Sequence, residues 1–193
     1  VHLVVHFRED DGLLLGAQAV GTDGVDKRID VLATALRNRM TVADLIDLDL
    51  AYSPPYGNAK DPVTMAGLIG NNVLTGTIRL WYPWQLDDVM ASSLVLDTRS
   101  PAEFASGHLP GALNIAHTEL RRRIDEVREV AAGRPVRVMC ASGMRSYLAH
   151  RVLTENGLDS ATLSGGILTL RAFLDGTDVL HDTDSIHTSG RLQ

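Results

Sequence analysis

The only cysteine of the chain lies in the stretch Val138-Met139-Cys140-Ala141-Ser142-Gly143-Met144-Arg145-Ser146-Tyr147. The apolar run over 136–139 predicts a short buried strand before it. Apolar residues recur at helical spacing after it and predict a helix that ends at Gly157. Cys140 is therefore expected in a tight turn between a strand and a helix. Free backbone N–H groups and the helix dipole favour the nucleophilic thiolate there.

A lone cysteine can also be a buried structural residue. Two neighbours favour the reactive alternative, because Gly143 lets the backbone turn inward and Arg145 adds a positive charge one turn into the helix. Four residues separate Cys140 from Arg145, and their backbone N–H groups can converge on the sulfur as an anion-binding nest. We therefore predict Cys140 as the catalytic nucleophile. The predicted substrate-binding residues are Ala141, Ser142, Gly143, Met144 and Arg145.

Composition and charge restrict the function. The chain has 193 residues, enough for one large or two small domains, with 45% hydrophobic and 22% charged residues. A net charge of -6 gives no support to a nucleic-acid partner, and no apolar run reaches the length of a membrane span. We find no secretory signal, and one cysteine excludes an internal disulfide, so we expect a cytoplasmic protein. The seven histidines show no ligand spacing with the cysteine, so we predict no metal site.

The sequence of the first half predicts a hairpin and three helices. Residues 1–7 and 13–20 are β-rich runs around an Asp-Gly turn. Residues 23–38 have a helical pattern. The residues predicted for its buried face are Val25, Ile29, Leu32, Ala33 and Leu36. Thr41 is expected to cap a second, short helix with Val42, Leu45 and Ile46 on its inner face. Asp61 and Pro62 predict the start of a third helix, over about 63–73. That helix is apolar on nearly every side, which indicates either a self-association surface or a core helix of a small domain.

We place a domain boundary at 75/76. The chain starts with Val1 and enters strand-like sequence at once, which suggests a fragment of a longer protein. Residues 182–193 are polar and are expected to be a disordered tail.

The second half, residues 76–181, alternates short apolar runs with helical patterns, which is typical of a doubly wound α/β fold with a parallel sheet. We expect strands over 78–81, 93–96, 136–139 and 161–163. Trp84 and Leu86 are candidates for the inner face of a helix over 83–90, and Thr118 is expected to cap a helix over 119–127.

The first half resembles the C-terminal dimerisation domain of flavin-dependent pyridine-nucleotide disulfide oxidoreductases, and among them the coenzyme A-disulfide reductase branch. The strings that carry this resemblance are Gly16-Ala17-Gln18-Ala19-Val20-Gly21, Val25-Asp26-Lys27-Arg28-Ile29-Asp30, Ala51-Tyr52-Ser53-Pro54-Pro55-Tyr56 and Ala59-Lys60-Asp61-Pro62. It implies a partial α+β domain over 1–75 and a homodimer through this half. It also implies that Tyr52, or as second choice Tyr56, reaches the partner's active site. Packing of the two aromatics on the Pro-rich loop is an equally open alternative.

The second half resembles the rhodanese (sulfurtransferase) domain. The strings that carry this resemblance, in order, are Leu96-Asp97-Thr98-Arg99, Glu103-Phe104, Gly107-His108-Leu109-Pro110-Gly111-Ala112, the Cys140 loop (residues 140–145) and Leu163-Ser164-Gly165-Gly166. The resemblance implies a persulfide on Cys140, formed from a small-molecule sulfur donor and passed to a thiol acceptor. Asp97 and Arg99 are predicted as an ion pair that supports the loop or the following helix. His108 is predicted as structural.

Together the two resemblances imply the C-terminal part of a flavoprotein–rhodanese fusion. The sequence has no Gly-x-Gly-x-x-Gly turn, so we expect no cofactor in this chain and expect FAD, NAD(P)H and coenzyme A in the intact protein. One alternative is a cysteine phosphatase, which usually has one more residue between cysteine and arginine and a histidine where this chain has Met139. The other is a non-catalytic dimerisation or interaction module, which fits the first half well and the Cys140 loop badly.

Overall fold

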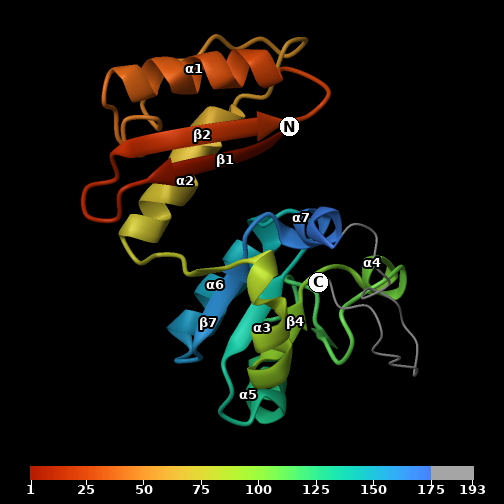
Figure 1. The fold of residues 1–193 in the computed structure, drawn as a ribbon. Coiled ribbons are helices and arrows are strands. Elements are labelled where there is room, and N and C mark those ends of the chain that lie inside the picture. Colours follow the sequence, from red (N-terminus) through yellow and green to blue (C-terminus); the bar gives the residue numbers. More distant parts are fainter. Residues whose placement is uncertain (175–193) are drawn as a thin grey trace, which may run out of the picture. The chain divides into compact units, whose positions relative to one another are not determined.

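A computed structural model describes residues 1–174 of the chain (Figure 1). The described residues form two compact units, residues 1–78 and residues 79–174. The predicted tail at 182–193 lies outside the described residues, as does the predicted domain end at 181. Among residues 1–174, no helix is both long and apolar enough to cross a membrane.

The first unit is an antiparallel hairpin with two helices. Strands β1 (His2–Phe7) and β2 (Leu14–Val20) pair from His2 opposite Val20 to Phe7 opposite Leu14, with an irregularity after His6. Helix α1 (Val25–Arg37) packs on β2, and α2 (Pro62–Leu74) packs on β1. The predicted hairpin and the helices predicted over 23–38 and 63–73 are therefore confirmed. The short helix predicted after Thr41 is wrong, because residues 42–46 form turns. The predicted buried face of α1 is wrong at Ala33, which is exposed, because the helix turns Leu32 and Ala35 to the core instead.

The start of α2 follows from its sequence. The Asp61 side chain accepts the N–H of Val63 at 3.0 Å, and Pro62 occupies the first turn, where no backbone donor is needed. Gly67 and Gly70 face the segment 42–46 so closely that a Cβ at Gly67 would lie 2.8 Å from the Leu45 Cβ atom. The buried face of α2 is thus its glycine face, and the side chain of Ile69 remains 44% exposed.

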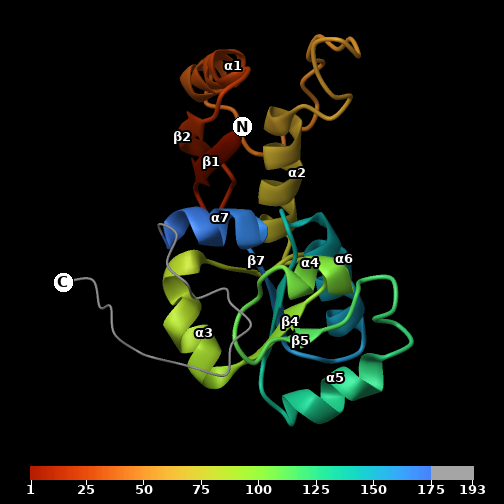
Figure 2. The same cartoon turned by 90° about the vertical axis from the view of Figure 1, so that its right-hand side faces the viewer.

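The second unit contains a parallel sheet of five strands in the order β3-β7-β6-β4-β5. The strands are β3 (Leu80–Trp81), β4 (Leu94–Asp97), β5 (Leu113–Asn114), β6 (Val136–Met139) and β7 (Ser160–Leu163). The helices are the 3-10 turn η1 (Pro83–Gln85), α3 (Leu86–Ser92), α4 (Pro101–Ala105), α5 (Ile124–Ala131), α6 (Met144–Glu155) and α7 (Gly166–Phe173). Figure 2 shows α3 and α7 on one side of the sheet and α5 and α6 on the other.

Alternate strand residues supply two cores, one on each face of the sheet. Val95 and Met139 point to the core beneath α3 and α7, while Leu96 and Val138 point to the core beneath α5 and α6. Because strand side chains alternate between faces, a parallel sheet covered on both sides needs nearly continuous apolar strands. The short apolar runs of the sequence meet this requirement, which confirms the doubly wound α/β class.

Four details of the second unit differ from the sequence prediction. Trp84 is 67% exposed because it stacks on Tyr82 outside the core, and Trp81 is the buried tryptophan instead. Helix α5 begins at Ile124, since residues 117–123 form turns, so Thr118 caps no helix. Strand β5 was not predicted because it has only two residues. The strand predicted over 78–81 is shorter, since β3 covers only Leu80–Trp81.

Candidate active site

The Cys140 loop lies at the carboxyl end of β6, in the middle of the sheet, where parallel α/β folds place their ligands. Cys140 is 1% exposed. Gly143 precedes α6 with a φ of 121°, a backbone conformation that side chains strongly disfavour, and its N–H donates to the Cys140 Sγ atom at 3.1 Å. The glycine therefore lets the loop curl back so that a backbone donor faces the sulfur.

Opposing effects act on the pKa of the Cys140 thiol. Burial raises the pKa, whereas hydrogen bonds lower it, from the Ser146 hydroxyl and from the N–H groups of Ser146, Gly143 and Ser142. The hydrogen bonds prevail, and the pKa lies below its ordinary value of 9.0. The N–H groups that face the sulfur therefore belong to Ser142, Gly143 and Ser146, whereas the sequence predicted them for residues 141–144. Ala141 has another role, because its carbonyl accepts the N–H of Leu168 at 3.2 Å.

Ser146 and Thr162 form a buried hydroxyl pair behind the sulfur, which sequence reasoning did not find. Ser146 Oγ lies 3.4 Å from Cys140 Sγ and donates to the Gly143 carbonyl at 2.9 Å, while Thr162 on β7 donates to Ser146 Oγ at 2.7 Å. When the thiol ionises, the Ser146 hydroxyl can turn to donate to the sulfur, with Thr162 still holding its oxygen. The position of Ser146, directly after Arg145, was the available signal.

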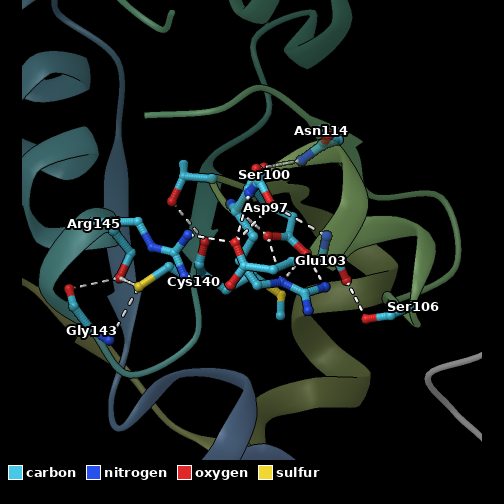
Figure 3. Close-up of polar contacts among 12 residues, drawn as sticks. Asp97, Ser100, Glu103, Ser106, Asn114, Cys140, Gly143 and Arg145 are labelled. Carbon is cyan, nitrogen blue, oxygen red and sulfur yellow. Dashed lines mark hydrogen bonds and ion pairs between the residues drawn. The ribbon is translucent and has the colours of Figure 1, made fainter. Parts of the chain in front are cut away.

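Arg145 lies between Cys140 and Glu103 (Figure 3). Its two terminal nitrogens each donate to one Glu103 carboxylate oxygen at 2.7 Å. This contact is the main reason why the pKa of Arg145 is raised, with a smaller contribution from Cys140, and why the pKa of Glu103 is held far below its usual value. The positive charge expected at the loop is therefore shared with a carboxylate that was not predicted as a site residue. Its signal was the Ser100-x-x-Glu103 capping box.

Asp97 and Arg99 form a buried ion pair at the carboxyl end of β4. The Arg99 Nη2 atom donates to Asp97 Oδ2 at 2.7 Å and to the Gly107 carbonyl at 2.8 Å. The pair thus braces the turn that contains His108, whose ring stacks on Phe104 with centroids 3.7 Å apart. Thr98, between the two charged residues, contacts the strand that precedes Cys140, since its Oγ1 donates to the Met139 carbonyl at 3.0 Å.

The Gly165-Gly166 string brings the start of α7 against the Cys140 loop. The N–H of Ile167 donates to the Cys140 carbonyl at 2.9 Å. A Cβ on Gly166, whose φ is +64°, would collide with the Ala141 carbonyl and lie 2.7 Å from the Cys140 carbonyl oxygen. Only glycine permits this approach, and the carbonyls on the back of the loop are thereby satisfied by α7.

Tyr52 and Tyr56 lie in the first unit, in the loop before α2. Their side chains are 55% and 84% exposed, and Tyr52 lines a pocket of about 360 Å³ together with Asp61, whose carboxylate pairs with Arg28 at 2.9 Å. Among residues 1–174, no three His, Cys, Asp or Glu side chains gather as metal ligands would.

Two family models match the chain in tandem. Residues 1–62 match the dimerisation domain of the pyridine nucleotide-disulphide oxidoreductases, and residues 84–171 match the rhodanese-like domain. The two matches occur in the order that the sequence strings predicted. The described site residues from Asp97 to Gly166 all fall inside the rhodanese-like match.

Known proteins are similar to part or to most of the chain. Coenzyme A disulfide reductase of Staphylococcus epidermidis is 48% identical over 67 residues, which are 35% of this chain and 15% of that protein. The structure of reduced Bacillus anthracis CoADR-RHD is 38% identical with a TM-score of 0.83, over 90% of this chain and 31% of that one. The structure of an NAD-dependent persulfide reductase from A. fulgidus is 36% identical with a TM-score of 0.76, over 86% of this chain and 29% of that one. The chain thus spans less than a third of the length of each of these relatives.

Proposed function

We propose that this chain, which joins an oxidoreductase dimerisation domain to a rhodanese-like domain, carries sulfane sulfur as a persulfide on Cys140. The observation that carries the proposal is the lowered pKa of a buried thiol that faces backbone N–H groups and the Ser146 hydroxyl at the end of β6. A thiolate attacks sulfane sulfur, and donors that face the sulfur also stabilise the negative charge of the product.

The reaction divides into two displacements at sulfur. The Cys140 thiolate attacks the outer sulfur of a donor such as thiosulfate, a sulfur–sulfur bond forms, and sulfite leaves with the electron pair of the broken bond. The resulting persulfide anion lies against the Gly143 N–H. Cyanide or a thiol then attacks the terminal sulfur, so that thiocyanate or a new persulfide leaves and the Cys140 thiolate returns. No oxidant, reductant or metal enters either step.

For the longer protein we propose a coenzyme A-disulfide, persulfide or polysulfide reductase that acts as a homodimer in the cytoplasm. The names of the relatives, coenzyme A disulfide reductase and NAD-dependent persulfide reductase, support this. FAD, NAD(P)H and coenzyme A would then be bound mainly outside this chain, which has no Gly-x-Gly-x-x-Gly turn. Tyr52 and Tyr56 are exposed and free to contribute to the partner's active site, as the resemblance implies.

The test is sulfur transfer from thiosulfate or a low-molecular-weight persulfide to cyanide, with the wild type against Cys140→Ala. We expect thiocyanate from the wild type alone. Mass spectrometry of the intact chain after donor treatment should show one added sulfur atom, lost again with cyanide. Equal rates in the two proteins would refute the role of Cys140. Turnover of an aryl phosphate without sulfur transfer would favour a phosphatase instead.

A further inference from the structure

Glu103 forms a bidentate ion pair with Arg145, the arginine of the Cys140 loop. Both terminal nitrogens of Arg145 are bound at 2.7 Å. Glu103 is itself fixed, since its Oε2 atom accepts the N–H of Ser100 at 3.0 Å and the Ser100 hydroxyl at 2.9 Å. The carboxylate is thus part of a capping box that exists whether or not a donor is present.

This pairing changes the charge that a sulfur donor meets. A guanidinium whose terminal nitrogens were free could bind the oxygens of a sulfonate with two parallel hydrogen bonds. Here the edge of the guanidinium formed by the two terminal nitrogens faces Glu103, and the carboxylate charge offsets the positive one. Arg145 still interacts with Cys140, but the hydrogen bonds that lower the pKa of the thiol come from neutral groups, namely backbone N–H groups and the hydroxyl of Ser146. The pair therefore weakens the attraction for a highly charged donor while leaving the cradle for the persulfide intact.

The side chains that project beside the loop are apolar. Met144 begins α6 and is 55% exposed, Leu148 lies one turn later on the same face and is 47% exposed, and Leu168 on α7 is 51% exposed. Leu168 is held at the loop by the bond from its N–H to the Ala141 carbonyl. Isolated exposed apolar residues are common, but these three lie on the two helices that begin next to the Cys140 loop, where an organic group could contact them.

We propose that Glu103 is a specificity-determining residue, which neutralises Arg145 and so makes Cys140 discriminate against doubly charged sulfane donors in favour of donors with an organic group and fewer charges. This inference rests on the proposed sulfur transfer. Glu103 touches no reacting atom and acts through Arg145.

Two donors with the same reacting bond isolate the effect of charge. Thiosulfate carries two negative charges and methanethiosulfonate one, and each delivers its outer sulfur to the Cys140 thiolate, with sulfite or methanesulfinate as the leaving group. The variant is Glu103→Gln, because the glutamine oxygen can keep the capping box and one hydrogen bond from Arg145, while the charge and the second bond are removed. We expect the ratio of kcat/KM for methanethiosulfonate to that for thiosulfate to fall about five- to tenfold at low salt, and less at high salt.

The pKa of Cys140 provides a second measurement, which distinguishes the loss of the Glu103 charge from a loss of loop structure. Removal of the carboxylate charge leaves Arg145 free to favour the thiolate, so the pH midpoint of Cys140 alkylation should move down in Glu103→Gln. A loop that is merely disordered would move it up and lower both donor rates together. Glu103→Asp keeps the charge and should keep the donor ratio of the wild type.

The matched control is Glu126→Gln on α5, because Glu126 also makes a bidentate pair at 2.7 Å, here with the Nε and Nη2 atoms of Arg123, outside the Cys140 loop. This control should leave the donor ratio unchanged. A ratio in Glu103→Gln within twofold of the wild type would overturn the inference, even with sulfur transfer intact. Absence of transfer from both donors in the wild type would instead refute the proposed function itself.

Discussion

Replacement of Gly166 with alanine should loosen the contact between α7 and the Cys140 loop. Gly166 has a φ of +64°, which costs an L-residue about 1–2 kcal/mol. The new methyl group would also collide with the Ala141 carbonyl, so α7 must retreat and weaken the two hydrogen bonds from Ile167 and Leu168. Each such bond contributes about 1 kcal/mol. We therefore expect the second unit to lose about 3–4 kcal/mol of unfolding free energy.

Urea denaturation followed by tryptophan fluorescence measures this loss. Both tryptophans of the chain, Trp81 and Trp84, lie in the second unit, and Trp81 is in the same core as Ile167. Gly157→Ala is the control, because Gly157 has a φ of +75° and no atom within 4 Å of an added Cβ. It should cost only the backbone penalty, about 1–2 kcal/mol. Equal losses in the two variants would refute the argument that Gly166 is needed for close approach.

Three further outcomes are expected. Ser146→Ala should raise the pKa of Cys140 and slow its alkylation at neutral pH several-fold. Iodoacetamide labelling over a pH series measures this pKa. An unchanged pH midpoint of labelling would contradict the assigned hydrogen bond. Burial lowers the pKa of His150 from 6.5 to about 4, so between these pH values the unfolded chain binds one more proton than the folded chain. The free energy of unfolding should therefore rise by about 3 kcal/mol from pH 4 to 6.5. Urea titrations of His150→Gln should show a smaller rise. Ile69→Lys should shift a dimer toward monomer in sedimentation at micromolar concentration, with α-helical circular dichroism unchanged.

The sequence allowed most of the fold to be predicted because the relevant signals are local. The strand over 136–139 was assigned to the residue, and the Asp61-Pro62 start of α2 was also correct. The errors of the sequence prediction concern residues whose local pattern is compatible with two different structures. Trp84 is apolar at a helical position, yet its ring stacks on Tyr82 outside the core. Thr118 is the other case, because its sequence context is that of a helix cap, yet residues 117–123 form turns and α5 begins at Ile124.

The sequence by itself determined the reactive element: a strand, a turn with Cys140 and a helix, with Gly143 placed where only glycine permits the curl. What only the tertiary structure decided is the set of groups around the sulfur. Glu103 is 42 positions from Arg145, and Thr162 is 16 from Ser146. The reason is that these partners lie on α4 and β7, and the strand order that brings them to β6 leaves no trace in the spacing of residues along the chain. A charge at the loop was therefore predictable, and its neutralisation was not.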